Sequence, residues 1–516
     1  MTGSGLRAAS GIVAAGLALG VAELVSVAVD TSSAPLAAIG ATVVDHTPDG
    51  VREWAIDTFG TNDKLVLFVS MGVVALGVAA FAGRIERVSR PLGSVLLAVF
   101  GLVAVVAAVN RPAASWTWAL PTIVGVALGI AVLRLLISYC EPASSGSGRP
   151  DPATEESADA RMDRRQAVRG IVGVGVLAVA TGVAGRVLGS SAHNVSGERA
   201  AVQLPVPNTP VPQVDPAADL RIPGLTPYLT PNADFYRIDT ALVVPQVSID
   251  TWSLRIHGMV DREIRLSYAD LARRTPVERL VTLTCVSNPV GGDLVGNASW
   301  LGYRLDELIA AAGPHPDADM VLSRSIDGFT AGSPLAALTD GRDALLAVGM
   351  NGEPLPVKHG YPARLVVPGL YGYVSATKWV TELEITRFDR AQAYWTKRGW
   401  AARGPIKIGT RIDTPHTGGR LTAGDITVAG VAWAQHRGIT TVEVQIDDGP
   451  WQTARLAAEP SVDTWRQWTY TWPATPGPHT LRARATDGTG ETQTSEPRDV
   501  IPDGASGYPD VSVRVA

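Results

Sequence analysis

Cysteine is scarce in this chain: of 516 residues only two are cysteines, Cys140 and Cys285. Cys140 stands at the end of an apolar stretch, and Cys285 lies in the polar half of the sequence. The membrane topology argued below places them on opposite sides of a bilayer, which excludes a disulfide between them. An unpaired cysteine in an exported domain needs another reason to be there, so Cys285 becomes a candidate site residue.

The chain also lacks an excess of positive charge. Its 44 Lys and Arg residues are outnumbered by 49 Asp and Glu residues, for a net charge of -5 at pH 7. This balance argues against a nucleic-acid partner. Haem ligands are missing as well, because there is no Cys-x-x-Cys-His motif and all eight histidines lie outside the apolar stretches. No haem is therefore evident.

Charged residues are rare in five apolar stretches within the first 190 residues. These stretches are residues 6–29, 65–82, 92–109, 116–137 and 170–188. About 20 apolar residues span a bilayer, and the Gly, Ala, Val and Leu monotony leaves no polar face of the kind that helices in a soluble core show. We expect a membrane region with four transmembrane helices in residues 1–140 and a fifth in residues 168–189. The near absence of central charges argues against a transporter.

The arginine distribution gives these helices an orientation. The short loop 84–90 and the segment 161–169 are basic and should face the cytoplasm, whereas the loop 30–64 is acidic on balance and should lie outside. The N-terminus is then inside, and everything after about residue 190 is outside. We expect a multi-pass protein of the cytoplasmic membrane with its polar part on the extracytoplasmic side.

The segment between the fourth and fifth spans carries two signals. Residues 141–167 begin with a run rich in Pro, Ser, Gly and acidic residues, which predicts a flexible cytoplasmic linker. Near its end, Arg164 and Arg165 precede a weakly hydrophobic, Gly-rich stretch, which resembles an internal twin-arginine export signal. Such a route would suit a domain that folds around a cofactor in the cytosol. The alternative is that the two arginines only enforce the positive-inside topology.

The polar half divides into three parts. Residues 190–221 are Pro-rich and predict an extended tether. Residues 222–400 mix short strands and helices, which predicts an α+β domain. In residues 401–516 helical periodicity disappears and strands recur between turns such as 447–450, which predicts an Ig-like β-sandwich.

Cys285 ends an alternating segment, residues 279–285, and precedes a loop with Gly291 and Gly292. A thiolate at a strand end can reach a ligand, and soft sulfur suits a metal that has several sulfur ligands. Taken alone, a lone cysteine is more often a small buried hydrophobe, and a nucleophilic thiol needs a paired histidine. All three interpretations stay open from this residue alone.

A basic, Gly-rich segment follows Cys285 in the sequence. His359 and Arg364 flank a Gly-Tyr-Pro turn, and Lys378 comes after a loop that contains Gly369. An Arg fork matches phosphate geometry and Lys adds a point charge, while the glycines let the backbone approach a ligand closely. Together these residues predict a site for a phosphate-bearing cofactor.

These motifs, in this order, resemble the molybdopterin-binding domain of the sulfite oxidase family, and residues 401–516 resemble that family's β-sandwich dimerisation domain. The likeness runs from about residue 225 to the end of the chain. The segments that carry it are residues 231–237, 252–258, 282–288, 300–305, 350–356 and 359–369.

The resemblance implies a cofactor, a reaction and a site. Molybdenum-molybdopterin would be the cofactor, with Cys285 as its protein thiolate ligand, and the reaction would be a two-electron oxo-transfer on a small substrate. Arg237, Tyr394 and Lys397 would complete the catalytic set. The expected cofactor-binding residues are Asn232, Phe235, Tyr236, Asn288, His359, Arg364, Ser375 and Lys378. Phe235 and Tyr236 have an alternative as core aromatics. The family's sandwich also makes a homodimer an expectation.

The sequence departs from the family near the expected substrate. Pro289 and Val290 stand where sulfite oxidases carry an arginine pair, so positive charge for a small oxyanion is lost. Lys397 occupies the place of the family's active-site tyrosine, with Tyr394 nearby. Three functions stay open: a sulfite oxidase-like enzyme, an S-oxide or N-oxide reductase of the same fold, and an export-anchored binding protein that has lost the metal. In the enzymes, electrons would pass to or from a separate cytochrome or quinone.

Overall fold

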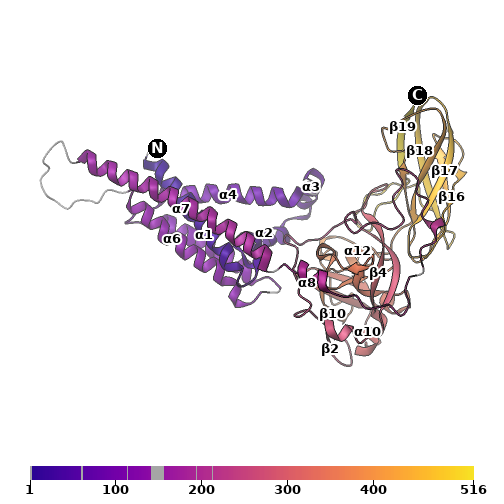
Figure 1. Cartoon of the computed structure of the whole chain (residues 1–516), viewed down its shortest axis with the longest axis horizontal. Helices are drawn as coiled ribbons and strands as arrows, with labels where there is room; N and C mark the ends of the chain where they lie inside the picture. Colours follow the sequence, from indigo (N-terminus) through magenta and orange to yellow (C-terminus); the bar gives the residue numbers. More distant parts are fainter. Residues whose placement is uncertain (1–2, 60–61, 113, 141–155, 193, 212) are drawn as a thin grey trace. The chain divides into compact units, whose positions relative to one another are not determined.

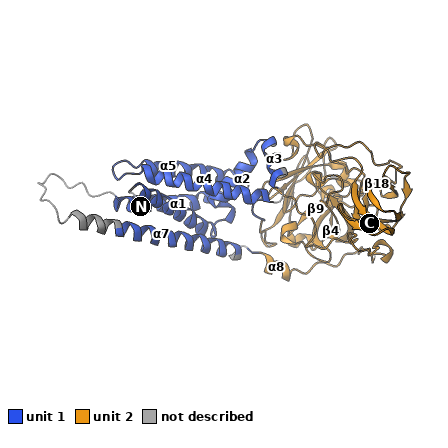
Figure 2. Ribbon diagram, turned by 90° about the horizontal axis from the view of Figure 1, so that it is seen from above, with its two compact units in different colours: residues 1–194, 241–244 blue, residues 195–240, 245–516 orange. Residues whose placement is uncertain are grey.

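The computed structural model describes residues 3–516 except 60–61, 113, 141–155, 193 and 212. Two compact units make up the chain (Figure 2). Unit 1 holds residues 1–194 and 241–244, and unit 2 holds residues 195–240 and 245–516.

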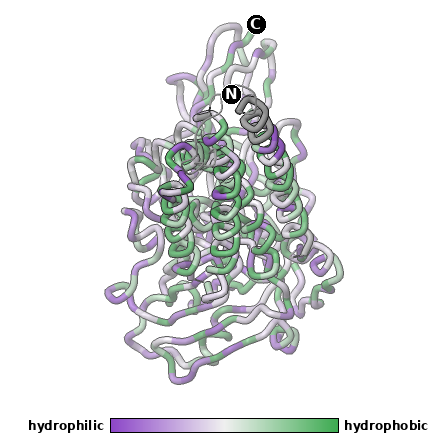
Figure 3. Tube along the Cα trace, turned by 90° about the vertical axis from the view of Figure 1, so that its left-hand side faces the viewer, coloured by the Kyte–Doolittle hydropathy of each residue, from purple (hydrophilic) through white to green (hydrophobic). Residues whose placement is uncertain are grey.

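Unit 1 is helical (Figure 1). The α-helices among its described residues are α1 (Gly3–Ser26), α2 (Pro35–His46), α3 (Asp49–Phe59), α4 (Asp63–Ile85), α5 (Leu92–Val109), α6 (Leu120–Ser138) and α7 (Glu156–Ala192), with 3-10 turns η1 (Thr31–Ser33) and η3 (Trp116–Ala119). Within the described residues, five helical stretches are long and apolar enough to cross a membrane: Ser4–Ser26, Asp63–Ile85, Leu92–Val109, Trp116–Ser138 and Arg165–Ser190. Their apolar character is visible along the tubes in Figure 3. The five predicted stretches are therefore confirmed as candidate spans.

Helix α1 is central to unit 1, since it packs against α4, α6 and α7. Glycine makes this packing close: a Cβ at Gly11 would collide with the carbonyl oxygen of Ala79, and one at Gly125 would collide with that of Ala18. Close backbone approach through small residues is typical of helix pairs in membranes.

Three predicted features of unit 1 and its exit differ from the structure. Residues 30–64, expected as a loop, contain α2 and α3. Helix α7 begins at Glu156, so residues 156–167 are helical rather than a flexible linker, because their Ala, Arg, Met and Gln residues favour a helix that continues into the span. Residues 141–155 and the side chain of Arg164 lie outside the described part. The expected tether contains α8 (Ser196–Ala201) and η4 (Pro216–Ala218), and Thr209 forms a bridge to Val277.

Unit 2 begins with an α+β part that has two sheets. One sheet has the order β3-β4-β7-β8, with β9 paired to β7, and the other has the order β2-β1-β10-β5-β6. The first sheet consists of β3 (Val277–Thr284), β4 (Val295–Arg304), β7 (Leu345–Met350), β8 (Glu353–Pro354) and β9 (Arg364–Val366). The second consists of β1 (Ser253–Gly258), β2 (Ile264–Ser267), β5 (Met320–Ser325), β6 (Thr330–Pro334) and β10 (Val380–Thr386).

Short helices connect these strands. They are α9 (Tyr268–Leu271), α10 (Leu305–Ala312), α11 (Leu335–Thr339), α12 (Gly372–Ser375), η5 (Val357–His359) and η6 (Thr396–Arg398). Ser267 and Asp270 form a capping box at α9, with the Ser267 hydroxyl accepting from the Asp270 N–H at 3.2 Å. Gly313 closes α10 in the left-handed conformation at φ 71.

The rest of unit 2 is a β-sandwich, as predicted. One sheet has the order β11-β13-β17-β16 and the other β12-β19-β18-β14-β15. The strands are β11 (Gly409–Thr414), β12 (Arg420–Leu421), β13 (Gly424–Trp433), β14 (Ile439–Ile446), β15 (Gln452–Thr453), β16 (Arg455–Leu456), β17 (Arg466–Ala474), β18 (Gly477–Asp487) and β19 (Asp510–Val515). Alternate residues from both sheets, such as Val428, Val444, Trp468 and Ala483, fill its core.

Candidate active site

Cys285 lies directly after β3. Its N–H donates to Leu294 O at 2.9 Å, which extends the β3–β4 ladder one residue beyond Thr284. The side chain is buried, and its Sγ lies 2.9 Å from the Ser287 hydroxyl. Burial raises the pKa of the Cys285 thiol, while the Ser287 hydroxyl, nearby amides and the positive charge of Lys378 act the other way.

The sandwich supports the strand end that carries Cys285. Trp465 N–H donates to Thr282 Oγ1 at 2.8 Å. Gln435 Nε2 donates to Thr282 O at 3.0 Å and to Thr284 Oγ1 at 2.9 Å. The position of the thiol is therefore fixed by the β3–β4 ladder on one side and by the sandwich on the other.

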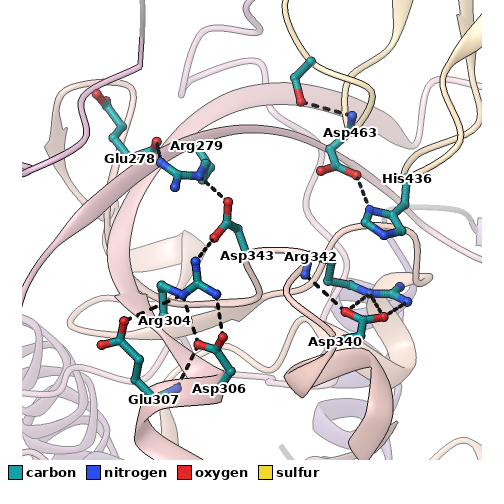
Figure 4. A network of polar contacts seen from close by, with 11 residues as sticks. Glu278, Arg279, Arg304, Asp306, Glu307, Asp340, Arg342, Asp343, His436 and Asp463 are labelled. Carbon is teal, nitrogen blue, oxygen red and sulfur yellow. Dashed lines mark hydrogen bonds and ion pairs between the residues drawn. The ribbon is translucent and has the colours of Figure 1, made fainter.

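Ion pairs hold the opposite end of the same sheet (Figure 4). Asp343 accepts from Arg279 Nε at 2.6 Å and from Arg304 Nη1 at 2.7 Å, which ties the start of β3 to the end of β4. In the sandwich, His436 Nδ1 lies 3.3 Å from Asp463 Oδ1. These partly exposed pairs contribute little to stability.

The predicted segment 235–237 runs beside this sheet. The ring of Phe235 lies 5.3 Å from that of Tyr236, 5.8 Å from Trp300 and 5.7 Å from His359. A Cβ at Gly296 would reach within 2.8 Å of the Phe235 ring, so β4 needs a glycine there. Phe235 belongs to the core cluster. Burial, followed by the charge of Cys285, raises the pKa of Tyr236, which places its hydroxyl in the same pocket.

Arg364, the first residue of β9, is a buried cation. Its guanidinium donates to His359 O at 3.1 Å and to Ala376 O at 3.4 Å, and it lies 5.1 Å from the centre of the Trp300 ring. Burial lowers the pKa of Arg364 to about 10, so it remains charged at neutral pH. Burial and the neighbouring cations lower the pKa of His359 to about 3, so this imidazole is neutral.

Gly360 brings two of the predicted cations together. It has a φ of 113, and a Cβ there would lie 3.0 Å from Arg364 Cβ and 3.2 Å from Lys378 Cα. A side chain would therefore push Arg364 and Lys378 apart as well as strain the backbone. The glycine of the Gly-Tyr-Pro turn thus allows Arg364 and Lys378 to pack close to the same backbone.

Lys378 and Arg237 share a carboxylate. Asp239 Oδ2 accepts from Lys378 Nζ at 2.6 Å and from Arg237 Nε at 2.7 Å. Burial lowers the pKa of Lys378 to about 8, and Asp239 opposes this shift. Lys378 is therefore still charged at neutral pH. Both predicted site residues, Lys378 and Arg237, lie beside the carboxylate of Asp239.

The remaining predicted cofactor residues have structural contacts. Asn232 Nδ2 donates to Glu353 Oε1 at 2.5 Å and its Oδ1 accepts from Asn351 at 2.8 Å. Asn288 Oδ1 accepts from Leu294 N–H at 2.9 Å and closes the loop after Cys285. The buried Ser375 hydroxyl donates to the backbone at the start of α12. Their roles in cofactor binding stay predictions.

Tyr394 and Lys397 belong to another group of contacts. The Tyr394 ring lies 5.8 Å from Phe329 and 5.2 Å from Trp395, and the Arg398 guanidinium covers it at 3.6 Å. Lys397, in η6, is exposed. These contacts join neither residue to Cys285, and their catalytic roles stay predictions.

A cavity system opens between the α+β part and the sandwich. A narrow cavity is lined by Cys285, Asn288, Val290 and, from the sandwich side, Lys407. A larger cavity of about 570 Å³ shares Val290, Gly291, Ser506 and Gly507 with it. Neither cavity is lined by Arg364 or Lys378.

The residues present fit a molybdopterin. Arg364 is buried, and no carboxylate in the described part of the chain lies within 4.0 Å of its guanidinium, so a cofactor phosphate would supply the missing counter-charge. Among the described residues no three His, Cys, Asp or Glu side chains gather as a metal site. Cys285 would therefore supply a single protein ligand, with the other sulfur ligands coming from the cofactor.

Sequence reasoning missed several residues around this site. Asp239 and Trp300 contact predicted site residues, and Gln435 contacts Thr284, the residue before Cys285. Of these three, only Asp239 lies near a predicted site residue in sequence, two positions after Arg237. The sequence signal for Asp239 was its position: a carboxylate two residues after an expected substrate-binding arginine can form an ion pair with it. Gln435 could not be found in this way, since it lies 151 residues from Thr284.

Several known proteins are similar to this chain. A family profile, the oxidoreductase molybdopterin binding domain, matches residues 241–395. The chain is 29% identical over 289 residues to mitochondrial sulfite oxidase of Homo sapiens, which covers 47% of this chain and 52% of that protein. The chain thus spans about half the length of this relative. It is 32% identical over 153 residues to the uncharacterized oxidoreductase YuiH of Bacillus subtilis, covering 30% of this chain and 74% of that protein.

A solved structure shows the same fold. The sulfane dehydrogenase SoxCD from Paracoccus pantotrophus superposes with a TM-score of 0.50 at 24% identity, covering 56% of this chain and 81% of that chain. One conclusion follows from these matches, together with the buried thiol at the end of β3 and the cations Arg364 and Lys378. The chain belongs to the sulfite oxidase family of molybdopterin-dependent oxidoreductases.

Proposed function

We propose that this chain is a membrane-anchored enzyme that transfers one oxygen atom between a small substrate and water at a centre held by Cys285, while two electrons pass to or from a separate redox partner. In the oxidising direction a sulfite-like donor takes oxygen from water and releases two protons and two electrons. In the reducing direction an oxide takes up two protons and two electrons and releases water. The molybdenum cofactor, when bound, supplies the redox metal.

The chain's own residues would hold and orient the reactants. Cys285 supplies the thiolate ligand, and Arg364 and Lys378 bind the cofactor phosphate. Neutral His359 offers a hydrogen-bonding ring without adding charge, while Arg237 orients the substrate. The observation that carries the proposal is the buried Cys285 thiol at the end of β3. Burial raises its pKa, and the nearby charge of Lys378 opposes that rise only in part.

A second candidate is the reduction of an S-oxide or N-oxide. Pro289 and Val290 supply no charge where the family's arginine pair would bind an oxyanion, and both line the narrow cavity beside Cys285. The adjoining cavity of about 570 Å³ has room for an organic substrate. Electrons would come from a separate cytochrome or quinone.

We further propose that the five apolar helical stretches anchor the enzyme in the cytoplasmic membrane, that unit 2 lies on the extracytoplasmic side after twin-arginine export, and that the sandwich forms a homodimer. The arginine-rich loop 84–90 supports this orientation. Protease treatment of intact spheroplasts should release unit 2, whereas its protection would contradict the orientation. The mass of the detergent-solubilised protein, from light scattering, tests the dimer.

Molybdenum quantification on the purified full chain tests the enzyme against the binding protein. The enzyme should contain about one molybdenum per chain, and Cys285→Ser should abolish turnover of sulfite, S-oxides and N-oxides. Cys140→Ser makes the same substitution at the other cysteine, in unit 1, and serves as the control. Metal-free protein, or a Cys285→Ser variant with unchanged turnover, would refute the proposal.

A further inference from the structure

Tyr371 lines the narrow cavity beside Cys285, and the expected cofactor and substrate residues do not include it. It directly precedes α12 and is 4% exposed. Its N–H donates to Gly404 O at 2.7 Å, which fixes the backbone from which the ring projects. A tyrosine hydroxyl at such a depth usually has hydrogen-bond partners, so the partners of this one indicate what it does.

The Tyr371 hydroxyl lies on the sandwich side of this cavity. The N–H of Lys407 donates to it at 3.4 Å. A Cβ at Gly504 would lie 2.6 Å from the hydroxyl oxygen, so only a glycine leaves room for it there. Lys407 itself and Ala505, the residue after Gly504, line the cavity. The two sandwich segments that bracket the hydroxyl therefore also form the cavity wall.

The proton of this hydroxyl has no acceptor among the residues that the structure describes, since the hydroxyl only accepts a hydrogen bond there. Other hydroxyls on the cavity wall donate elsewhere. The Thr410 hydroxyl donates to Gln493 Oε1 at 3.0 Å, and the Ser506 hydroxyl donates to a backbone carbonyl at 2.8 Å. A phenol has a pKa of roughly 10, so Tyr371 keeps its proton at neutral pH and can offer it to a ligand.

The volumes of the two cavities indicate what can meet this donor. The narrow cavity holds about 30 Å³, which is room for little more than one water-sized group. The larger cavity of about 570 Å³ shares Val290 and Ser506 with it. A compact organic molecule with one protruding oxygen atom matches this shape. Its oxygen fits the narrow cavity that Cys285 and Tyr371 line, and its carbon groups fit the larger cavity.

We infer that Tyr371 is a further catalytic residue, whose hydroxyl donates a hydrogen bond to the oxygen atom of an organic S-oxide while that oxygen is released as water. The inference rests on the proposed function in its reducing direction. As the bond between sulfur and oxygen breaks, negative charge develops on the oxygen, and a donor already held at that place stabilises the charge. The two electrons come from the separate redox partner and the two protons from water, so Tyr371 keeps its own proton.

The alternative is that the Tyr371 hydroxyl only joins the α+β part to the sandwich through Lys407. A purely structural hydroxyl would change thermal stability and would affect the binding of every ligand alike. A donor to the substrate oxygen affects only ligands that carry this oxygen. Dimethyl sulfoxide and dimethyl sulfide differ by that one atom. The ratio of their dissociation constants therefore separates the two roles, and it needs no turnover.

The experiment uses the full-length holoenzyme with Tyr371→Phe, which keeps the ring and removes the hydroxyl. The dissociation constants of dimethyl sulfoxide and dimethyl sulfide are measured without an electron donor by tryptophan fluorescence, since Trp433 lines the narrow cavity. Turnover of dimethyl sulfoxide is measured with a reduced viologen as electron donor. Tyr373→Phe is the matched control, because the Tyr373 hydroxyl donates to Ala401 O at 2.7 Å and the residue lines neither of the two cavities.

Tyr371→Phe should bind dimethyl sulfoxide about tenfold more weakly, as expected for the loss of one hydrogen bond, and should lower kcat/KM for it by at least the same factor. Dimethyl sulfide should bind as it does to the wild type, and Tyr373→Phe should leave both constants unchanged. An unchanged ratio of the two constants in Tyr371→Phe, or molybdenum-loaded wild-type protein that binds no dimethyl sulfoxide, would overturn the inference and leave the proposed function standing. Molybdenum-free wild-type protein would overturn both.

Discussion

Gln435 in the sandwich donates its Nε2 to the hydroxyl of Thr284, the residue before Cys285, at 2.9 Å. The same nitrogen donates to Thr282 O at 3.0 Å. Both contacts are buried, so they hold the last three residues of β3 against the sandwich. The C-terminal domain thereby supports the position of Cys285 within a single chain, independently of any dimer that it forms.

Replacing Gln435 with leucine should destabilise unit 2. The change leaves the Thr282 carbonyl and the Thr284 hydroxyl buried without this donor, which costs about 1–3 kcal/mol. We expect the thermal unfolding midpoint in detergent to fall by several degrees and the bound molybdenum per chain to decrease. Gln445→Leu, which removes partly buried contacts to Gly449 and Arg482 away from Cys285, is the control. An unchanged midpoint in Gln435→Leu would contradict the support described here.

Gly360→Ala should reduce cofactor binding. The new Cβ would press on Arg364 and Lys378, in addition to a backbone strain of about 1–2 kcal/mol at positive φ. Gly418→Ala isolates the strain, since Gly418 has a φ of 78 and nothing within 4 Å of the added atom. Fluorescence of the oxidised pterin released from each protein measures the bound cofactor. Equal losses in the two variants would show that strain alone is responsible.

The neutral state of His359 predicts an acid-dependent stability. Its pKa is about 3 in the folded chain and 6.5 as an ordinary histidine, so between these values the unfolded chain binds a proton that the folded chain does not. Stability is therefore lost as the pH falls from 6.5 toward 3. His359→Gln should flatten this part of the curve of unfolding midpoint against pH, relative to the exposed-surface variant His416→Gln. If the curves of unfolding midpoint against pH ran parallel for His359→Gln and the wild type, they would contradict the lowered pKa of His359.

Restoring one missing charge should change ligand preference. Val290 is 38% exposed and lines both cavities near Cys285, so an arginine fits there. Val290→Arg should bind sulfate about tenfold more tightly, as expected for one charge-assisted contact. Val206→Arg adds the same charge at an 86% exposed position and tests for a general effect of net charge. Matching sulfate affinities in the two variants would exclude a local effect.

Much of the fold was readable from the sequence because local patterns report burial. Long apolar runs gave the five candidate spans, and alternation gave β3 with Cys285 at its end. The glycine at 313 and the serine at 267 marked helix boundaries by their backbone and capping chemistry. Helix α3 in residues 30–64 was missed because its weak hydrophobicity resembles that of a loop.

The sequence by itself determined the candidate spans, most strands and the residue types expected at a molybdopterin site, because hydrophobic period and turn residues are local properties. Only the tertiary structure decided which charges meet. Asp239 and Lys378 are 139 residues apart, and Gln435 and Thr284 are 151 residues apart. Contacts over such distances depend on how the sheets and the sandwich pack, and periodicity states only which residues are buried, not which partner each one faces.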